Sequence, residues 1–145
     1  MPLMHSLTLA ADNRADIAHA LAGDRWIVAC LCAAWCGTCS SYRAVFDELA
    51  ARHPDKHFIW IDIEDQAEVV GDLDVENFPT LLIQRHETVA FFGTMLPDAG
   101  VADRLVQAQA AQSDDELVRL TAASAERRAW QRDANLRTLL RAAGD

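Results

Sequence analysis

Apolar residues follow two different spacings along the chain, and these spacings predict its secondary structure. Residues 26–32 form a continuous apolar run rich in strand-forming side chains, which is typical of a central strand covered on both faces. From Cys36 onward the spacing becomes helical, and the apolar side of this predicted helix carries Tyr42, Val45, Phe46 and Leu49. A buried strand therefore leads directly into a long amphipathic helix.

The same pattern predicts an alternating series of further strands and helices. Strands are expected at 5–10, 57–63, 80–84 and 88–92, and helices at 13–21, 64–73 and 98–110. A turn at residues 85–87 would join the last two strands as a hairpin. The order indicates an α/β fold in which strands joined through helices are parallel and the last pair is antiparallel.

The last part of the chain is a different kind of segment. Ser113 and Glu116 have the spacing of a capping box, so a new helix begins there and is expected to run as far as Gly144. We therefore divide the chain into a domain at 1–111 and a C-terminal helical extension at 112–145. The thin apolar stripe of the extension lacks sustained heptads, and we expect it to pack on the domain or on a second copy, with Trp130 as its anchor. The chain is then a monomer or a weak dimer through this helix.

Composition and charge narrow the classes of partner. The 145 residues are 51% hydrophobic and 24% charged, which fits one soluble globular domain. The net charge of −9 argues against nucleic acid and anionic membranes as partners. Residues 1–12 contain no Lys or Arg, so we expect no signal peptide and a cytoplasmic protein. Thiols are kept reduced in that compartment, and clustered cysteines there indicate redox or metal chemistry.

Cys36 and Cys39 stand where the predicted strand gives way to the helix. With two residues between them, their sulfurs can close a small reversible disulfide on the first helical turn. The unpaired N–H groups of that turn carry positive partial charge, which favours a thiolate at Cys36. The segment Ala34-Trp35-Cys36-Gly37-Thr38-Cys39 is therefore a candidate dithiol redox site.

Two motifs make the chain similar to the thioredoxin family over about residues 7–110. Trp35-Cys36-Gly37-Thr38-Cys39 resembles the family's WCGPC motif, and Phe78-Pro79-Thr80 resembles its cis-proline segment. The resemblance implies a thioredoxin-like fold, with a central mixed sheet flanked by helices, and thiol–disulfide oxidoreductase activity on protein disulfides. It makes Cys36 the nucleophile and Cys39 the resolving thiol.

The resemblance also implies the client groove and the partners. Residues expected to contact the client are Trp35, Gly37, Thr38, Phe78, Pro79 and Gly93. The backbone of Phe78 would pair with an extended client segment as a short added strand. The expected partners are disulfide-containing client proteins and a recycling reductase or thiol pool. No cofactor is expected, because the two sulfurs carry the electrons.

Three positions depart from the family pattern. Thr38 replaces the proline of the motif, Cys30 stands where the family usually has a buried aspartate, and Trp60 falls on the position often held by a partner lysine. Proton transfer to and from Cys39 must then use water or another group. These losses leave room for an alternative function, a binding or assembly module with little redox turnover.

Cys30 and Cys32 add two more sulfurs to the same region. Two residues apart on a strand, they point to the same face and are expected to lie under Cys36 and Cys39. They are either small buried apolar residues or auxiliary thiols, of which one exchanges with Cys39 or forms a second disulfide. A zinc or iron–sulfur site is a further alternative. We expect no metal, because structural zinc sites commonly take paired cysteines from two separate knuckles.

Overall fold

A computed structural model describes residues 6–144 except 34, 72, 74 and 76. The elements in chain order are β1 (Leu7–Thr8), α1 (Arg14–Ala20), β2 (Ile27–Cys32), α2 (Gly37–Arg52), β3 (His57–Asp62), α3 (Ala67–Val70), β4 (Thr80–Arg85), β5 (Thr88–Thr94), α4 (Ala99–Ala110), α5 (Asp114–Thr121), α6 (Ala125–Asp133) and α7 (Leu136–Gly144). This order confirms the predicted alternation of strands and helices as far as α4. No helix among the described residues combines the length and apolar character needed to cross a membrane.

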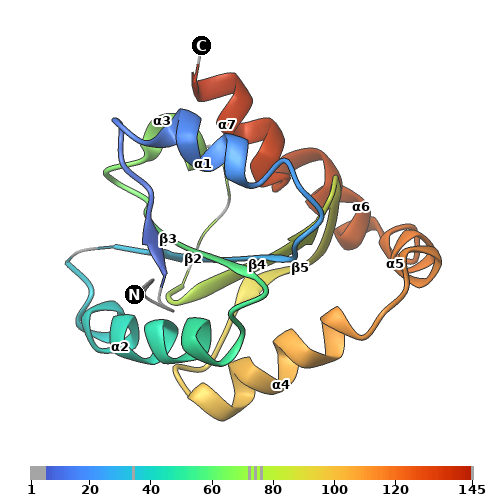
Figure 1. Ribbon diagram of the computed structural model, residues 1–145, viewed down its shortest axis with the longest axis horizontal. Helices are drawn as coiled ribbons and strands as arrows, with labels where there is room; N and C mark the ends of the chain where they lie inside the picture. Colours follow the sequence, from blue (N-terminus) through green and yellow to red (C-terminus); the bar gives the residue numbers. More distant parts are fainter. Residues whose placement is uncertain (1–5, 34, 72, 74, 76, 145) are drawn as a thin grey trace.

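The described strands form one mixed sheet in the order β1-β3-β2-β4-β5. Helices α2 and α4 cover one face, and α1, α3 and α7 lie over the other (Figure 1). All six residues of β2 are buried, which confirms the prediction of a central strand covered on both faces. The fold class predicted from the sequence, α/β with a central mixed sheet, is also confirmed.

One predicted strand direction is wrong. Strand β3 is parallel to β2, but β4 is antiparallel to β2 although a helix lies between β3 and β4. Helix α3 has four residues and spans only about 6 Å, whereas a six-residue strand spans about 20 Å. The helix alone does not carry the chain back along the sheet, and the connection begins and ends at the same end of β2: Asp62 is paired with Cys32 and Thr80 with Leu31.

Two other predicted elements are shorter than expected. The strand predicted at 5–10 is reduced to Leu7–Thr8, which pair with β3, and the N–H of Leu9 makes the last hydrogen bond to β3 at 2.9 Å. The N–H of Ala10 instead bonds the side chain of Asn13 at the turn into α1. Residue 5 lies outside the described residues. The helix predicted at 64–73 forms only at Ala67–Val70, and residue 72 also lies outside the described part.

Alternation along β2 divides its side chains between two hydrophobic clusters. Val28, Cys30 and Cys32 belong to the cluster under α2 and α4, which also contains Phe46. Ile27, Ala29 and Leu31 belong to the cluster on the opposite face, under α1 and α7. This division confirms that Cys30 and Cys32 share a face, and it places both beneath the start of α2.

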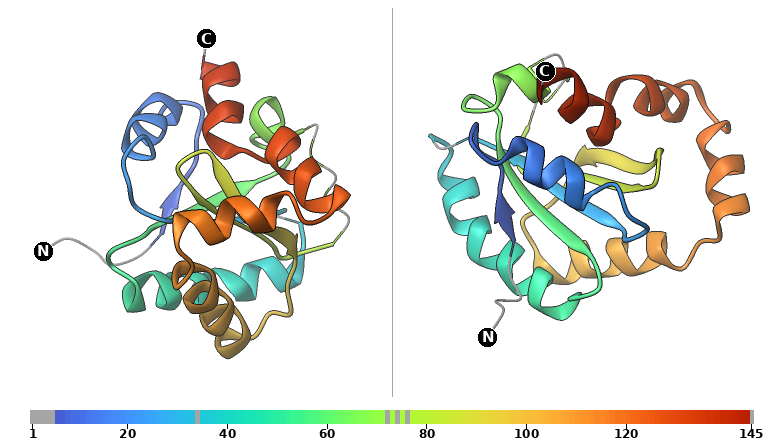
Figure 2. Two further views of the ribbon diagram at one scale, coloured as in Figure 1. Left: turned by 90° about the vertical axis from the view of Figure 1, so that its right-hand side faces the viewer. Right: turned by 45° about the horizontal axis from the view of Figure 1, so that its top comes forward.

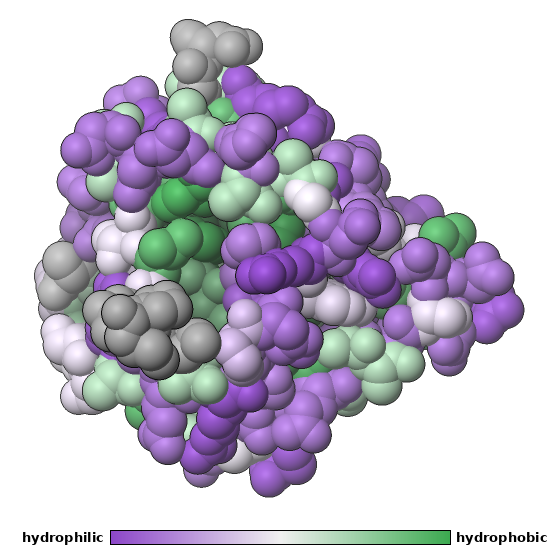
Figure 3. Space-filling model, viewed as in Figure 1, coloured by the Kyte–Doolittle hydropathy of each residue, from purple (hydrophilic) through white to green (hydrophobic). Residues whose placement is uncertain are grey.

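The described part of the extension forms three helices instead of the single helix considered from the sequence. Ser113 and Glu116 form the predicted capping box of α5. A second cap, in which the Ser124 hydroxyl accepts a hydrogen bond from the N–H of Arg127, begins α6. The chain turns twice and follows the margin of the sheet back to α1 (Figure 2). Its outward surface is mostly hydrophilic (Figure 3).

The extension packs on its own domain, as one of the two sequence alternatives predicted. Trp130 makes an edge-to-face contact with Phe91 of β5, with ring centroids 5.9 Å apart. Gln131 both donates to the carbonyl of Val89 and accepts from its N–H, each at 2.8 Å. Because β5 is an edge strand, α6 satisfies backbone groups that would otherwise be open to pairing with another chain.

A buried polar pair fixes α7 to the sheet. Gln84 of β4 is fully buried, and its side-chain amide donates to Asn135 at 2.7 Å. The Gln84 carbonyl oxygen accepts from the N–H of Leu136 at 2.8 Å. The Asn135 amide in turn donates to the Glu87 carboxylate at 3.0 Å. Leu136 can therefore enter the core without leaving buried amide groups unpaired.

Replacing Asn135 by alanine should destabilise the protein by about 1–3 kcal/mol, because the buried Gln84 amide loses a partner. Urea unfolding checks the free energy, and hydrogen exchange should show the loss concentrated in α7. Arg141→Ala serves as the control, since the side chain of Arg141 is 61% exposed and its loss should cost no more than about 0.5 kcal/mol. Equal effects of the two substitutions would contradict the assigned role of Asn135.

Candidate active site

The start of α2 holds the predicted dithiol. Cys36 is the N-cap residue, in extended conformation, and its N–H donates to the carbonyl of Ala33 at 3.0 Å. Cys36 is half-buried, whereas Cys39 in the first turn is 2% exposed. The predicted context, a buried strand feeding a helix at Cys36, is confirmed. It makes Cys36 the more accessible of the two sulfurs.

The disulfide in the structure joins Cys39 to Cys32. Their Cα atoms lie 5.7 Å apart, between the end of β2 and the first turn of α2. Cys36 and Cys30 are thiols, and the Sγ atoms of Cys30 and Cys32 are 3.9 Å apart. Cys36 packs against the cluster that contains the other three cysteines. The expectation of four neighbouring sulfurs is thus confirmed, and Cys32 is the one bonded to Cys39.

Burial dominates the electrostatics beneath α2. It raises the pKa of the fully buried Cys30 thiol far above its usual value, and the positive charge of Arg43 offsets only part of that effect. Burial also raises the pKa of Tyr42, and the adjacent Cys30 raises it further. Both groups therefore remain protonated and neutral at neutral pH.

A cavity of about 230 Å³ reaches Cys39 from the side of β3. Its walls include Arg43, Trp60 and Asp62. The Arg43 guanidinium lies 5.0 Å from the centre of the Trp60 ring, and Asp62 accepts hydrogen bonds from the N–H groups at 64 and 65. Trp60 does occupy this region, as the sequence comparison implied, and Arg43 supplies a positive charge there. Sequence reasoning missed Arg43, although its position one helical turn after Cys39 was a usable signal.

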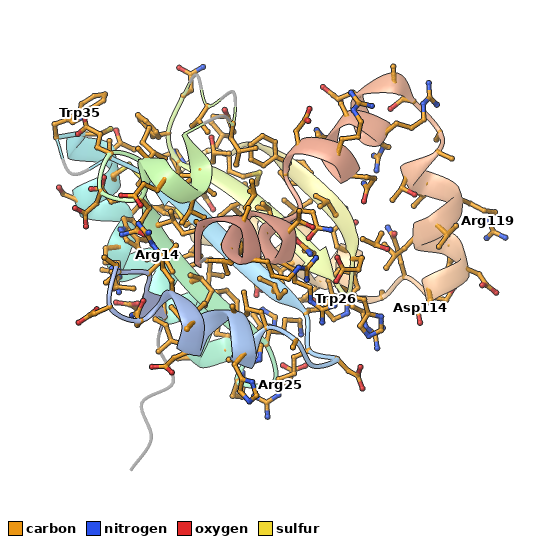
Figure 4. The ribbon with its side chains drawn as sticks, turned by 90° about the horizontal axis from the view of Figure 1, so that it is seen from above. Arg14, Arg25, Trp26, Trp35, Asp114 and Arg119 are labelled. Carbon is orange, nitrogen blue, oxygen red and sulfur yellow. A yellow bond between two sulfur atoms is a disulfide. The ribbon has the colours of Figure 1, made fainter. Side chains whose placement is uncertain are left out.

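Aromatic side chains form an exposed surface beside Cys36. Trp35 is 68% exposed and meets the half-buried Phe78 edge to face, with centroids 5.6 Å apart. The Phe78–Pro79 peptide bond is cis. Gly37 and Thr38 are exposed in the first turn of α2. Trp35 lies at the opposite side of the molecule from α5, which carries Asp114 and Arg119 (Figure 4).

Gly93 lies in a second hollow, between β5 and the extension. This cavity of about 470 Å³ is lined by Thr80 and Gly93 from the sheet and by Glu126, Trp130 and Asp133 from α6. The strand that carries Gly93 continues toward Pro79, whose carbonyl accepts from the N–H of residue 95 at 2.9 Å. The structure therefore adds α6 to the surroundings of Gly93. The sequence could not indicate this contact, because it depends on how the extension folds back.

No three His, Cys, Asp or Glu side chains within the described ranges are placed so as to hold a metal ion. In particular, the cysteine cluster is closed by a disulfide between two of its members. Its arrangement is that of sulfur redox chemistry.

Comparison with known proteins agrees with this arrangement. Residues 8–103 match the thioredoxin family. The chain belongs to this family. A thioredoxin of Ophiophagus hannah is 36% identical over 67 residues, which cover 46% of this chain and 62% of the relative. The match thus spans less than two thirds of that relative. The sequence-based recognition of the family is confirmed.

Solved thioredoxin structures share the fold. Thioredoxin f from spinach chloroplast has a TM-score of 0.63 and 22% identity, covering 75% of this chain and 96% of the spinach chain. A thioredoxin f2 solved in complex with ferredoxin:thioredoxin reductase has a TM-score of 0.60 and 24% identity, covering 78% of this chain and all of the other. Membership of the family, together with cysteines at bonding distance, supports thiol–disulfide oxidoreductase chemistry in general.

Proposed function

We propose that this thioredoxin-family protein reduces disulfides in client proteins through Cys36 and Cys39. The observation that carries the proposal is the accessible Cys36 thiol at the N-terminus of α2, in one cluster with the buried Cys39. The Cys36 thiolate attacks a client disulfide and forms a mixed disulfide. Cys39 then attacks Cys36, the reduced client leaves as a thiolate, and the electrons lost by the cysteine pair have passed to the client.

The exposed surface around Cys36 supports a protein as substrate. Trp35 and Phe78 offer an apolar face, and next to it lie the exposed backbone of Gly37 and the small exposed residue Thr38. An extended client segment laid along the backbone of Phe78 would bring its disulfide to Cys36. Glu126 and Asp133 stand beside Gly93, so a client segment that reaches this end of the groove should carry positive charge.

Recycling requires a reductant for the oxidised protein, and we propose a reductase or a thiol pool. A thioredoxin f2 of the same fold has been solved with a ferredoxin:thioredoxin reductase, which supports a reductase in this role. We propose the cytoplasm as its location, since a reducing compartment suits a protein that keeps two of its cysteines as thiols. A monomer or weak dimer suffices, because every proposed site residue lies on one chain.

A turnover assay tests this function directly. With dithiothreitol as electron donor and a test protein that holds an interchain disulfide, the full chain should accelerate reduction above dithiothreitol alone. If it gives no acceleration, the oxidoreductase proposal fails. Client affinity then tests the alternative: a binding module without turnover should hold its client equally well after Cys36→Ser, provided that circular dichroism shows an intact fold.

A further inference from the structure

The proposed exchange with a client uses only Cys36 and Cys39. The structure places a third cysteine, Cys32, at bonding distance from Cys39. Cys39 sits on the first turn of α2, between the half-buried N-cap residue Cys36 and the last residue of β2. It is bonded on the β2 side, to Cys32, while Cys36 keeps its thiol. Cys39 is therefore positioned to hold either of two partners.

We propose that Cys32 is a third redox cysteine, to which the disulfide passes from Cys36 once a client has been reduced. The proposal rests on the proposed function, since that reaction creates the Cys36–Cys39 disulfide. It assigns the buried Cys32–Cys39 pair as the form in which the oxidised protein is stored.

The transfer is a thiol–disulfide exchange within one chain. The Cys32 thiolate attacks the Sγ atom of Cys39, the Cys32–Cys39 bond forms, and the Cys36–Cys39 bond breaks. The electron pair of the broken bond leaves with Cys36 as a thiolate. One disulfide and one thiolate are present before and after the step, so it needs no added oxidant or reductant.

The surroundings of Cys32 and Cys39 fit this step. The Cys30 thiol, 3.9 Å from Cys32, remains protonated, so it does not compete with Cys32 as an attacking thiolate. Arg43 brings positive charge to the cluster and lines the cavity that reaches Cys39. That cavity also contains the polar side chains of Arg43 and Asp62, so water can enter it beside Cys39, the sulfur that Cys32 attacks.

The exchange replaces an accessible disulfide at Cys36 of the oxidised protein by an accessible thiol. Cys32 and Cys39 are 1% and 2% exposed, so their disulfide is shielded from the thiols of a bulky client protein. Cys36 meanwhile presents a thiol. While the disulfide joins Cys32 and Cys39, the thiols of a reduced client cannot attack it and become oxidised again. Recycling by a reductant requires the reverse exchange, in which Cys36 displaces Cys32 from Cys39.

Alkylation of the oxidised full-length protein tests the proposal. Reduced protein is oxidised with a small excess of diamide, desalted and treated with iodoacetamide without denaturant, and its mass is measured. We expect one adduct on the wild type, at Cys36. Zero adducts would overturn the proposal, because Cys36 would then be held in the disulfide.

Differential labelling identifies the bonded pair independently. After acid quenching, free thiols are alkylated in denaturant, the disulfide is reduced and the new thiols receive a second reagent. All four cysteines lie on one tryptic peptide, 26–43, so tandem mass spectrometry reads every label together. The second label should be on Cys32 and Cys39. A second label on Cys36 and Cys39 would overturn the proposal without any variant being made.

Two buried cysteines on the same face of β2 provide a matched pair of variants. Cys32→Ala should reduce the adduct on the oxidised protein from one to zero, because the disulfide then stays between Cys36 and Cys39. Cys30→Ala removes an equally buried sulfur and should keep one adduct. Loss of the adduct in both variants would contradict a specific role of Cys32.

Client turnover separates failure of this proposal from failure of the proposed function. Cys32→Ala should still reduce the test protein, since Cys36 and Cys39 remain. If wild type and variant both turn over but oxidised wild type takes no adduct, only the role of Cys32 is overturned. Absence of turnover in both proteins would overturn the proposed function and, with it, the transfer from Cys36.

Discussion

Cys36→Ser is expected to lower the turnover of protein disulfides by at least about a thousandfold. A serine hydroxyl is not ionised at neutral pH and cannot form the mixed disulfide that begins the reaction. The measurement is reduction of the test protein under dithiothreitol, corrected for the rate without enzyme. Cys36 is the half-buried N-cap of α2 and makes no disulfide in the structure, so the fold should survive the change.

Ser41→Ala is a matched control for the loss of Cys36. Ser41 is exposed in the same part of α2 and does not line the cavity that reaches Cys39, and its substitution should leave turnover close to the wild-type value. If Cys36→Ser retained most of the activity with an intact fold, a different cysteine would have to be the nucleophile. The proposed assignment would then be wrong.

Cys39→Ser should have the second large effect and stop the reaction halfway. The Cys36 thiolate still attacks the client, but no resolving thiol displaces it, so a mixed disulfide should accumulate to about one client per chain. Non-reducing electrophoresis and intact mass measure this species, and dithiothreitol should reduce the mixed disulfide and release the client. The buried Cys32 should not substitute for Cys39, because it lies on β2 beneath the first turn of the helix.

Two further variants make the trapping result specific. The double variant with serine at both Cys36 and Cys39 should trap no client, since the attacking sulfur is missing. Adding Cys32→Ala to Cys39→Ser should trap as much client as Cys39→Ser alone. Release of the client by Cys39→Ser only when Cys32 is present would show that Cys32 resolves the mixed disulfide directly.

The sequence predicted the parts of the site that depend on neighbouring residues. The apolar run before Cys36 and the helical spacing after it are local patterns, and they correctly placed β2, α2 and the dithiol segment between them. The prediction that Cys30 and Cys32 share a face was also local, because side chains alternate along any strand. Recognition of the family added the segment at Pro79, more than forty residues away.

The direction of β4 and the bond at Cys32 depend on packing that no local pattern contains. A short helix between β3 and β4 is compatible with either a parallel or an antiparallel direction of β4. In the structure, Asp62 and Thr80 lie at the same end of β2, and β4 is therefore antiparallel. Cys32 and Cys39 are seven residues apart. Their proximity follows from how α2 lies over β2.

The breaks in the extension were missed for a similar reason. Between Ser113 and Gly144 the sequence has neither Gly nor Pro to end a helix. Ser124 caps α6, but residue 127 is an arginine and does not complete a capping box. The break before α7 depends on the hydrogen bond between Asn135 and the buried Gln84 of β4, a contact that forms only in the folded chain.

An equilibrium redox titration tests the central claim most directly. The purified full chain is equilibrated in dithiothreitol or glutathione buffers across a range of potentials, quenched with acid, and its thiols are counted by alkylation and mass. A dithiol oxidoreductase should lose two thiols in one step within the biological range, with Cys39 in the disulfide and either Cys36 or Cys32 as its partner. Four thiols at every potential in that range would contradict the account.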